Sequence, residues 1–476
     1  MVNNIEMMGQ FEQYAKDLIK EHKIPGVGIA FNQNNERIYE KAFGYRNVGK
    51  QLPIDADTIF GIASMTKSFT CVAIMQLQET GKLSVHDEVI KYLPDFRTQD
   101  EEKSKRITIH HLMTHTSGLP PIATHVYARK RSIDQDPSAK DYGLDLMNNP
   151  EPAIDTYEEL LHYIAKQDFD LLGEPGEEFS YSNDCYGILG IIIDRVSGQS
   201  YEDYVMDHIL KPIQMNNSFF DLEELKKKEN NTTTLYMSRY SAEGVDVYEA
   251  PLWWDAPSMR AAGYLKSTIN DILKYLAMFL NEGMAGENRI LQAESVQQMV
   301  SPHVEFEKGR FYGYGLRIIP DYFGTTFINH GGGLKGVSSF MGILPEKGIS
   351  GVLLSSLADV PSDKLFLGAL NGIEGREPAA KHMHFQTHDV PVEKLSKFKG
   401  TFISGEGMKV RVDIVDGRLA ILTASGPNPL KCVEGNLFIG TLEDQENLIE
   451  FLSGADGNIN RIFYSSRQIL KSSDQV

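Results

Sequence analysis

The stretch GIASMTKSFTCVAIMQLQETGKL, residues Gly61–Leu83, contains the first motif of this chain of 476 residues. Ser64 and Lys67 are three residues apart, so on a helix their side chains lie on one face, one turn apart. Apolar residues occupy many of the other positions, and Gly81 suits the left-handed conformation that ends a helix. The stretch predicts a mostly buried helix with Ser64 at its N-terminus.

That position would change the chemistry of Ser64. Unpaired N–H groups and the helix dipole favour negative charge at a helix N-terminus. A serine hydroxyl is a weak nucleophile until a neighbouring base takes its proton, and a lysine held partly neutral by desolvation or by a second cation can be that base. The alternative is a serine N-cap followed by a solvated lysine, and Ser-x-x-Lys recurs at Ser396–Lys399.

A second motif, Tyr181-Ser182-Asn183, follows the turn-rich GEPGEEFS and precedes an apolar helical run from Ile188 to Val196. A tyrosine held in a loop beside a cation can act as a phenolate base or as a phenol acid. Asn183 would offer an amide that orients either the lysine or the substrate backbone. The alternative is a capping turn with a packed tyrosine.

The third motif, His330-Gly331-Gly332-Gly333, comes directly after the strand-like segment Thr325–Asn329. Glycines at a strand edge allow another backbone to approach closely. His330 would add a positive or hydrogen-bonding group beside the Ser64 hydroxyl. The alternative is a glycine-rich turn with an incidental histidine.

Strand-like segments lie at both ends of residues 1–376: Gly26–Phe31, Arg37–Phe43, Tyr314–Ile319, Thr325–Asn329, Val337–Leu344 and Gly351–Ser355. An amphipathic helix precedes them, helical patterns run from Ser64 to about Leu280, and a last helix covers Lys364–Gly372. The order predicts an α+β fold, with an antiparallel sheet flanked by helices and a helical subdomain inserted between its halves. The segment Pro120–Asp155 is expected to be a long loop.

The end of the chain is organised differently. Residues 377–390 are irregular, with prolines nearby, and are expected to be a linker. Short strands separated by polar turns, among them Gly426–Pro427, predict a small β-barrel over residues 391–476. The expected strands are Phe398–Ile403, Lys409–Val415, Arg418–Thr423, Leu437–Leu442 and Leu448–Leu452.

Composition excludes several classes of partner. A formal net charge of -18 argues against nucleic acid, which requires clustered Lys and Arg, and against an anionic membrane surface. No stretch approaches the ~20 apolar residues of a membrane span, and the N-terminus does not resemble a signal peptide, so a cytoplasmic protein is expected. Cys71, Cys185 and Cys432 have neither zinc-site nor disulfide spacing, and no metal or cofactor is predicted.

The three motifs, in this order, resemble the penicillin-recognising serine hydrolases. The match is to the branch that holds class C β-lactamases, D-alanyl-D-alanine carboxypeptidases, D-aminopeptidases and related esterases. ITIHHLMTHTSGLP (Ile107–Pro120) and AAGYLKSTIND (Ala261–Asp271) are similar to further segments of that family, so the resemblance covers about residues 10 to 375. The segment beginning LSKFKGTF at Leu395 resembles the lipocalin-like barrel appended to some members.

The resemblance implies roles for individual residues. Ser64 would be the acylated nucleophile, and Lys67 and Tyr181 would share the proton transfers; which of them deprotonates Ser64 stays open, because coupled groups titrate together. The oxyanion hole would be formed by the backbone N–H groups of Ser64 and Gly333. The remaining members of the predicted site bind the substrate or act electrostatically: Asn183, His330 and Gly332.

The chain also departs from the family pattern. Gly331 replaces a threonine whose hydroxyl would hold a substrate carboxylate, so the third motif is more similar to D-aminopeptidases and esterases. Lys335 could supply the missing charge, although an exposed lysine is the expected state. Pro120–Asp155 is expected to cover the cleft, and one residue of Trp253-Trp254 either lines the pocket or packs in the core.

These observations predict a serine hydrolase that acts through an acyl-enzyme on short peptides, with a D-residue near the scissile bond, or on small esters and amides. The alternatives are a penicillin-binding sensor or scaffold that acylates slowly, a weak β-lactamase, and a barrel that binds an apolar ligand beside a vestigial front domain. β-Lactams would be covalent ligands of Ser64 in the first two cases. The barrel is expected to pack near the cleft, where it would restrict substrate size or build a homo-oligomer.

Overall fold

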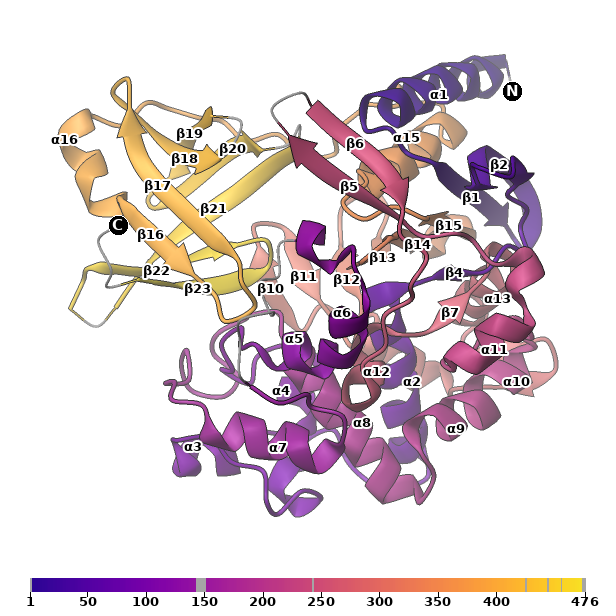
Figure 1. The fold of residues 1–476 in the computed structure, drawn as a ribbon, viewed down its shortest axis with the longest axis horizontal. Coiled ribbons are helices and arrows are strands. Elements are labelled where there is room, and N and C mark those ends of the chain that lie inside the picture. The colour runs from indigo at the N-terminus through magenta and orange to yellow at the C-terminus, as the bar shows by residue number, and fades with distance from the viewer. Residues whose placement is uncertain are drawn as a thin grey trace.

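The computed structural model describes residues 2–142, 151–241, 244–423, 426–442, 445–454 and 456–472. Within these residues, nine strands form one antiparallel sheet in the order β10-β11-β12-β13-β14-β15-β1-β2-β3, and eight strands, β16 to β23, close a barrel. Figure 1 shows the barrel beside the β10–β11 edge of the sheet, with most of the helices below the sheet. The predicted α+β fold with an appended barrel is confirmed.

The strands of the large sheet come from both ends of one unit. They are β1 (Gly26–Gln33), β2 (Glu36–Asn47), β3 (Leu52–Pro53), β10 (Val304–Glu307), β11 (Arg310–Tyr312), β12 (Arg317–Ile319), β13 (Phe327–Leu334), β14 (Val337–Leu344) and β15 (Ile349–Ser355). Because β1 pairs with both β2 and β15, the N-terminal hairpin closes onto strands that follow the helices. The first six residues of β1 are all buried, which fits a strand covered on both faces.

Helices cover the two faces of the sheet. On one face, α1 (Val2–Glu21) and α15 (Ser362–Ile373) pack side by side, and Phe11 and Phe366 join the core beneath them. On the other face lies the helical subdomain: α2 (Thr66–Glu79), α3 (Glu101–Lys105), α4 (Ile109–Met113), α5 (Thr124–Ala128), α6 (Lys130–Gln135), α7 (Tyr157–Lys166), α8 (Asn183–Ser197), α9 (Tyr201–Val205), α10 (Lys211–Ile213), α11 (Leu222–Lys227), α12 (Arg260–Gly263), α13 (Ile269–Leu280) and α14 (Ala293–Met299). We call α1 to α15 with their sheet the α+β unit.

Short strands accompany these helices in three two-stranded pairs. β4 (Phe60–Gly61) pairs with β7 (Lys266–Ser267), β5 (Tyr236–Ser241) with β6 (Gly244–Glu249), and β8 (Met284–Ala285) with β9 (Asn288–Arg289). The first pair fixes the entry to α2, since it holds Gly61 beside the segment that leads into α13. In the described part of the chain, no helix combines the length and the apolar character that a membrane crossing requires.

The barrel has a filled interior. Its strands are β16 (Gly400–Ile403), β17 (Lys409–Val415), β18 (Arg418–Thr423), β19 (Gly426–Glu434), β20 (Leu437–Leu442), β21 (Gln445–Ser453), β22 (Ile459–Tyr464) and β23 (Arg467–Lys471), and a short helix, α16 (Val392–Leu395), precedes them. The rings of Phe398, Phe438 and Phe451 contact one another with centroids 4.7–5.5 Å apart. Aromatic and aliphatic side chains therefore form the barrel core.

Several local predictions need correction. Pro120–Asp155 is not one long loop, because α5 and α6 lie in it and bury Val126 and Ile133; residues 143–150 of this segment lie outside the described residues. Gly426–Pro427 begins β19 and is not a turn. Prolines cannot donate to a sheet ladder and argue against a strand, which is why the sequence pattern concealed β19.

Candidate active site

Ser64 lies in a strained turn directly before α2. A short 3-10 helix, Ala63–Met65, leads into Thr66, the first residue of α2. Ala63 has a φ of 45°, in the left-handed region that residues with a side chain rarely adopt. Strain of this kind persists only where the surrounding structure imposes it. The turn thus holds the half-buried Ser64 side chain at the N-terminal end of a buried helix.

The Lys67 amine is fully buried and has three neighbours. It donates to the carbonyl oxygen of Ala262 at 2.6 Å and to Asn183 Oδ1 at 2.9 Å, and it lies 3.2 Å from Ser64 Oγ. The two oxygens can only accept hydrogen bonds. A neutral amine has two N–H bonds, so both would point to these oxygens and its lone pair would face the Ser64 hydroxyl.

The charge state of Lys67 depends on its surroundings. Burial lowers the pKa of the amine below its usual range, and the nearby charge of Arg467 acts in the same direction, whereas Tyr181 and Glu406 raise it. Burial disfavours the charged form of any amine. The net effect makes the neutral form that a base requires easier to reach than in a solvated lysine.

Tyr181 and Asn183 arrive from the start of α8. Ser182 caps this helix by accepting a hydrogen bond from the backbone N–H of Cys185. The motif therefore also forms the capping turn that was the alternative interpretation of its sequence. The Lys67 amine lies 4.9 Å from the centroid of the Tyr181 ring. The Tyr181 hydroxyl is buried and interacts with the Lys67 amine. The first two motifs therefore meet at Lys67.

Two residues of the barrel enter the same site, and sequence reasoning missed both. Glu406, in the turn between β16 and β17, accepts a hydrogen bond from Asn183 Nδ2 at 3.1 Å and forms an ion pair with Arg467. The Arg467 guanidinium lies 5.1 Å from the centroid of the Tyr181 ring. A charged residue between Gly405 and Gly407 was the only local signal in the sequence.

The contact between His125 and Glu406 is not an ion pair at neutral pH. The two atoms, His125 Nδ1 and Glu406 Oε1, are 3.3 Å apart. Burial, followed by the charge of Arg129, lowers the pKa of His125 to about 3. Burial opposes the ionisation of Glu406, but Arg467 and other neighbours outweigh this effect and lower its pKa. Glu406 is therefore a buried anion whose partner is Arg467.

A directional chain of hydrogen bonds connects the second motif to the third. The Ser182 N–H donates to His115 Nδ1 at 3.1 Å, so His115 must carry its proton on Nε2, which donates to the Tyr312 hydroxyl at 3.2 Å. At the other end, His330 Nδ1 must donate to the Gly331 carbonyl at 2.6 Å. Because Tyr312 already accepts from His115, its O–H is left to donate to His330 Nε2 at 3.1 Å. Both imidazoles are therefore neutral.

The neutral state of His330 corrects part of its predicted role. Burial, with the charges of Arg317 and Lys67, holds the pKa of His330 well below its usual range. His115 is lowered in the same way by burial and by Lys67. His330 therefore brings no positive charge at neutral pH, and its ring nitrogens contact Tyr312 and Gly331.

The glycines of β13 allow close contact with the turn at Ser64. A Cβ atom on Gly332 would lie 2.5 Å from the Ile62 carbonyl oxygen and 3.0 Å from the Ala63 Cβ, so a larger residue does not fit. Gly333 is exposed and a Cβ there would meet nothing within 4 Å. The third motif thus places an open stretch of backbone beside Ser64.

The predictions for Lys335 and for Trp253-Trp254 have different outcomes. Lys335 is not exposed: its amine is buried, lies 2.7 Å from Asp136 Oδ2 and donates to two backbone carbonyls. Trp254 is buried and donates to the same carboxylate at 2.8 Å, which fits core packing. Trp253 is partly buried and packs beside Gly61.

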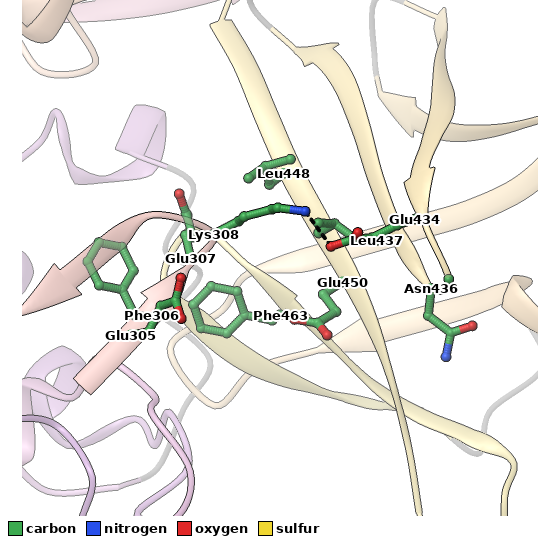
Figure 2. Close-up of a pocket in the computed structure, with 11 residues that line it drawn as sticks. Glu305, Phe306, Glu307, Lys308, Glu434, Asn436, Leu437, Leu448, Glu450 and Phe463 are labelled. Carbon is green, nitrogen blue, oxygen red and sulfur yellow. Dashed lines mark hydrogen bonds and ion pairs between the residues drawn. The ribbon is translucent and has the colours of Figure 1, made fainter. Parts of the chain in front are cut away.

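A cavity of about 660 Å³ lies away from Ser64, between the β10–β11 hairpin and the barrel. Figure 2 shows Phe306 and Phe463 in its wall and an ion pair between Lys308 and Glu434, whose charged atoms are 2.6 Å apart. This is a second contact between the barrel and the α+β unit. In the described ranges, no group of three or more His, Cys, Asp or Glu side chains is arranged to hold a metal ion.

Comparisons with known proteins agree with this geometry. "Protein flp" of Staphylococcus aureus (strain MW2) is 30% identical over 341 residues, which are 72% of this chain and 61% of that protein. The chain therefore spans about 61% of the length of that relative. "Penicillin-binding protein 4" of Amycolatopsis lactamdurans is 26% identical over 71% of this chain and 82% of its own length.

A solved structure extends the similarity to the barrel. The octameric penicillin-binding protein homologue from Pyrococcus abyssi is 30% identical, with a TM-score of 0.68, over 97% of this chain and 99% of its own. The family described as Beta-lactamase matches residues 11–369, which include all three motifs. The chain belongs to the beta-lactamase family and, with it, to the penicillin-recognising serine hydrolases.

Proposed function

We propose that this chain hydrolyses short peptides, with a D-residue near the scissile bond, or small esters and amides, through an acyl-enzyme on Ser64. The observation that carries the proposal is the environment of the Lys67 amine. Two oxygens accept the N–H bonds of the neutral amine. Its remaining position, which carries the lone pair, faces Ser64 Oγ at 3.2 Å. We take Lys67 as the base that activates the serine, because burial lowers the pKa of its amine and a neutral amine in this arrangement turns its lone pair towards the Ser64 hydroxyl.

The proposed reaction has two steps. Lys67 takes the Ser64 proton while Ser64 Oγ attacks the substrate carbonyl carbon, and the bond from that carbon to the leaving amine or alcohol breaks. Tyr181, whose hydroxyl is buried and interacts with the Lys67 amine, donates the proton that the leaving group needs and recovers one from Lys67. Water then attacks the carbonyl carbon of the ester on Ser64 and gives a proton to Lys67 or Tyr181. The bond from that carbon to Ser64 Oγ breaks, Ser64 Oγ takes a proton back from Lys67 or Tyr181, and the acid leaves.

The negative charge on the substrate oxygen needs donors. We assign this role to the backbone N–H groups of Ser64 and Gly333, which the family resemblance implies. The close packing of Gly332 on Ile62 and Ala63 brings the two backbone segments together. Donors of this kind each contribute on the order of 10²–10³ in rate.

The proposed substrate class follows from what the third motif lacks. Gly331 offers no hydroxyl for a substrate carboxylate, and His330 is neutral. The third motif therefore provides neither a hydroxyl nor a charge to bind the free carboxylate of a penicillin or of a carboxypeptidase substrate. Substrates whose acyl group is followed by an amide or ester without that carboxylate fit better.

The test is hydrolysis of p-nitrophenyl acetate and of D-Ala p-nitroanilide by the wild-type chain and by Ser64→Ala. We expect hydrolysis of both compounds in the wild type and its loss in the variant. Undiminished turnover by Ser64→Ala would remove Ser64 from the mechanism. L-Ala p-nitroanilide and nitrocefin in the same panel separate stereochemical preference and β-lactamase activity.

We also propose that the chain forms a homo-oligomer, because the related protein from Pyrococcus abyssi is described as octameric and is similar over nearly all of both chains. Sedimentation velocity of the full chain would measure its mass. A single species with the mass of one chain at micromolar concentration would contradict this proposal.

A further inference from the structure

Asn183 connects the barrel to the lysine of the active site. Its oxygen accepts from Lys67 at 2.9 Å, and its nitrogen donates to Glu406 at 3.1 Å. If the amide rotated by half a turn, its NH2 group would face the Lys67 donors and its oxygen would face the carboxylate. Both contacts would then be repulsive. The Glu406 carboxylate, which can only accept, therefore decides which way the amide points.

That orientation directs Lys67 towards Ser64. The Asn183 oxygen and the Ala262 carbonyl are the two acceptors that hold the amine, and the remaining direction faces Ser64 Oγ. If the Asn183 amide were free to rotate, one acceptor would be lost for part of the time. The lone pair of a neutral Lys67 would then have no fixed direction.

Arg467 stabilises Glu406 in this position. The two side chains form an ion pair in which Glu406 is 7% exposed and Arg467 is 18% exposed. A buried carboxylate is costly unless a cation and hydrogen bonds satisfy it. Arg467 also lies over the face of the Tyr181 ring, a cation–π geometry. The pair thus contacts both Asn183 and Tyr181.

The turns that carry these residues are held by backbone hydrogen bonds. The Gly405 N–H donates to the Pro121 carbonyl at 2.9 Å, and the Tyr181 N–H donates to the Ser466 carbonyl at 2.8 Å. A Cβ on Gly405 would lie 2.8 Å from the Pro121 oxygen, so glycine is required for this approach. The barrel is therefore fixed next to the second motif.

We propose that Glu406 and Arg467 are positioning residues for the hydrolysis at Ser64. Glu406 fixes the orientation of the Asn183 amide, which directs the Lys67 amine towards Ser64 Oγ. Arg467 holds the Glu406 carboxylate in place. Hydrolysis then requires the barrel to be docked on the α+β unit. The proposal rests on the function proposed above, because it concerns how Lys67 serves as the base.

The charges that act on Lys67 at neutral pH can be identified. Its titratable and charged neighbours among the described residues are Cys71, His115, His125, Tyr181, Tyr186, His330, Glu406 and Arg467. The three histidines have lowered pKa values, and burial raises the pKa of Cys71 to about 12 and that of Tyr186 well above its usual range. The permanent charges are Glu406, which raises the pKa of Lys67, and Arg467, which lowers it.

The experiment measures kcat and KM of the full chain for p-nitrophenyl acetate across pH. Glu406→Leu is expected to lower kcat on the order of 10²-fold with little change in KM, since misaligned catalytic groups cost about that much. Glu406→Gln keeps an oxygen that can accept from Asn183 and should recover part of the loss. The acid limb of kcat/KM, where Lys67 must lose its proton, moves to lower pH in both variants and to higher pH in Arg467→Gln.

The double variant Glu406→Gln/Arg467→Gln should return the acid limb towards its wild-type position, because both charges are removed. Unchanged kcat and acid limb in both Glu406 variants would overturn the proposal. A loss of kcat without any shift of the acid limb would also overturn it, since it would indicate a structural role alone. Thermal unfolding of each variant reports whether it is folded, and Glu406→Gln preserves the shape of the side chain.

Two further variants separate the possible failures. Glu434→Gln breaks the ion pair at the other barrel contact (Figure 2) and should leave kcat and the acid limb unchanged. If Ser64→Ala keeps full turnover, the proposed function itself fails. If Ser64→Ala is inactive while the Glu406 and Arg467 variants behave like wild type, only the positioning proposal fails.

Discussion

Two of the contacts between the barrel and the α+β unit differ in the burial of their charges. At the active site, Glu406 and Arg467 are 7% and 18% exposed, whereas Glu434 and Lys308, at the β10–β11 edge, are 63% and 47% exposed. Exposed ion pairs contribute ~0–1 kcal/mol, but removal of one partner from a buried pair costs ~3–5 kcal/mol. The charges of the first contact should therefore contribute more to stability, and by our proposal to hydrolysis, than those of the second.

The largest effect is expected at Lys67, which lies between the buried contact and Ser64, the proposed nucleophile. Lys67→Met removes the proposed base and should lower kcat/KM for p-nitrophenyl acetate by about 10²–10⁴-fold, the usual contribution of a positioned base. Steady-state hydrolysis measures it, with Glu434→Gln as the matched variant at the exposed contact. Activity of Lys67→Met within a few fold of wild type would show that the base lies elsewhere.

The next largest effect concerns stability, which should differ between variants at the two contacts. Arg467→Met leaves the Glu406 carboxylate buried without its cation, and the free energy of unfolding should fall by ~3–5 kcal/mol. Lys308→Met breaks the exposed pair and should change it by ~0–1 kcal/mol. Urea unfolding followed by circular dichroism gives both values. Equal losses at the two contacts would refute the comparison.

A pH effect is expected from Asp184, which is buried near Glu406. Burial first, and then Glu406, raise its pKa to about 7. The folded state therefore binds a proton that the unfolded state has released above pH ~4. The stability that this group contributes is complete below that pH and is lost as pH rises through about 7.

Asp184→Asn is neutral at every pH and tests this expectation. The difference in unfolding free energy between pH 5 and pH 8 should be smaller in the variant than in the wild type, by on the order of 2–4 kcal/mol. Urea unfolding at the two pH values measures it. An identical pH dependence in both proteins would mean that Asp184 ionises normally despite its burial.

The smallest of these effects concerns the chain of hydrogen bonds at Tyr312. Tyr312→Phe removes the hydroxyl that accepts from His115 and donates to His330. Two buried ring nitrogens lose their partners, so the unfolding free energy should fall by ~1–3 kcal/mol. Thermal unfolding measures the change, and imidazole NMR shifts would show whether both rings remain neutral. No change in stability would mean that water replaces the hydroxyl.

The elements that follow local patterns could be predicted from sequence. The helix that follows Ser64 ends at Glu79, and Gly81 has the expected left-handed φ of 70°. The spacing of Ser64 and Lys67 and the capping role of Ser182 are also local properties. The family resemblance then assigned Tyr181 and the glycines of β13 to the same site.

The parts that sequence could not predict depend on distant partners. Lys335 is buried because Asp136, almost two hundred positions earlier, supplies its counter-charge. Glu406 lies in a turn of the barrel and Arg467 at the start of β23, and nothing near them in sequence indicates Asn183 or Tyr181. Domain packing determines these contacts, so periodicity and motif spacing contain no information about them.

Peptide mass spectrometry of the wild-type chain, quenched during turnover of p-nitrophenyl acetate, would show whether Ser64 is the acylated residue. We expect an acetyl group on the peptide that contains Ser64, formed at the rate of p-nitrophenol release and absent in Ser64→Ala. An acetyl group that accumulates on another residue at that rate, with the Ser64 peptide unmodified, would contradict this expectation.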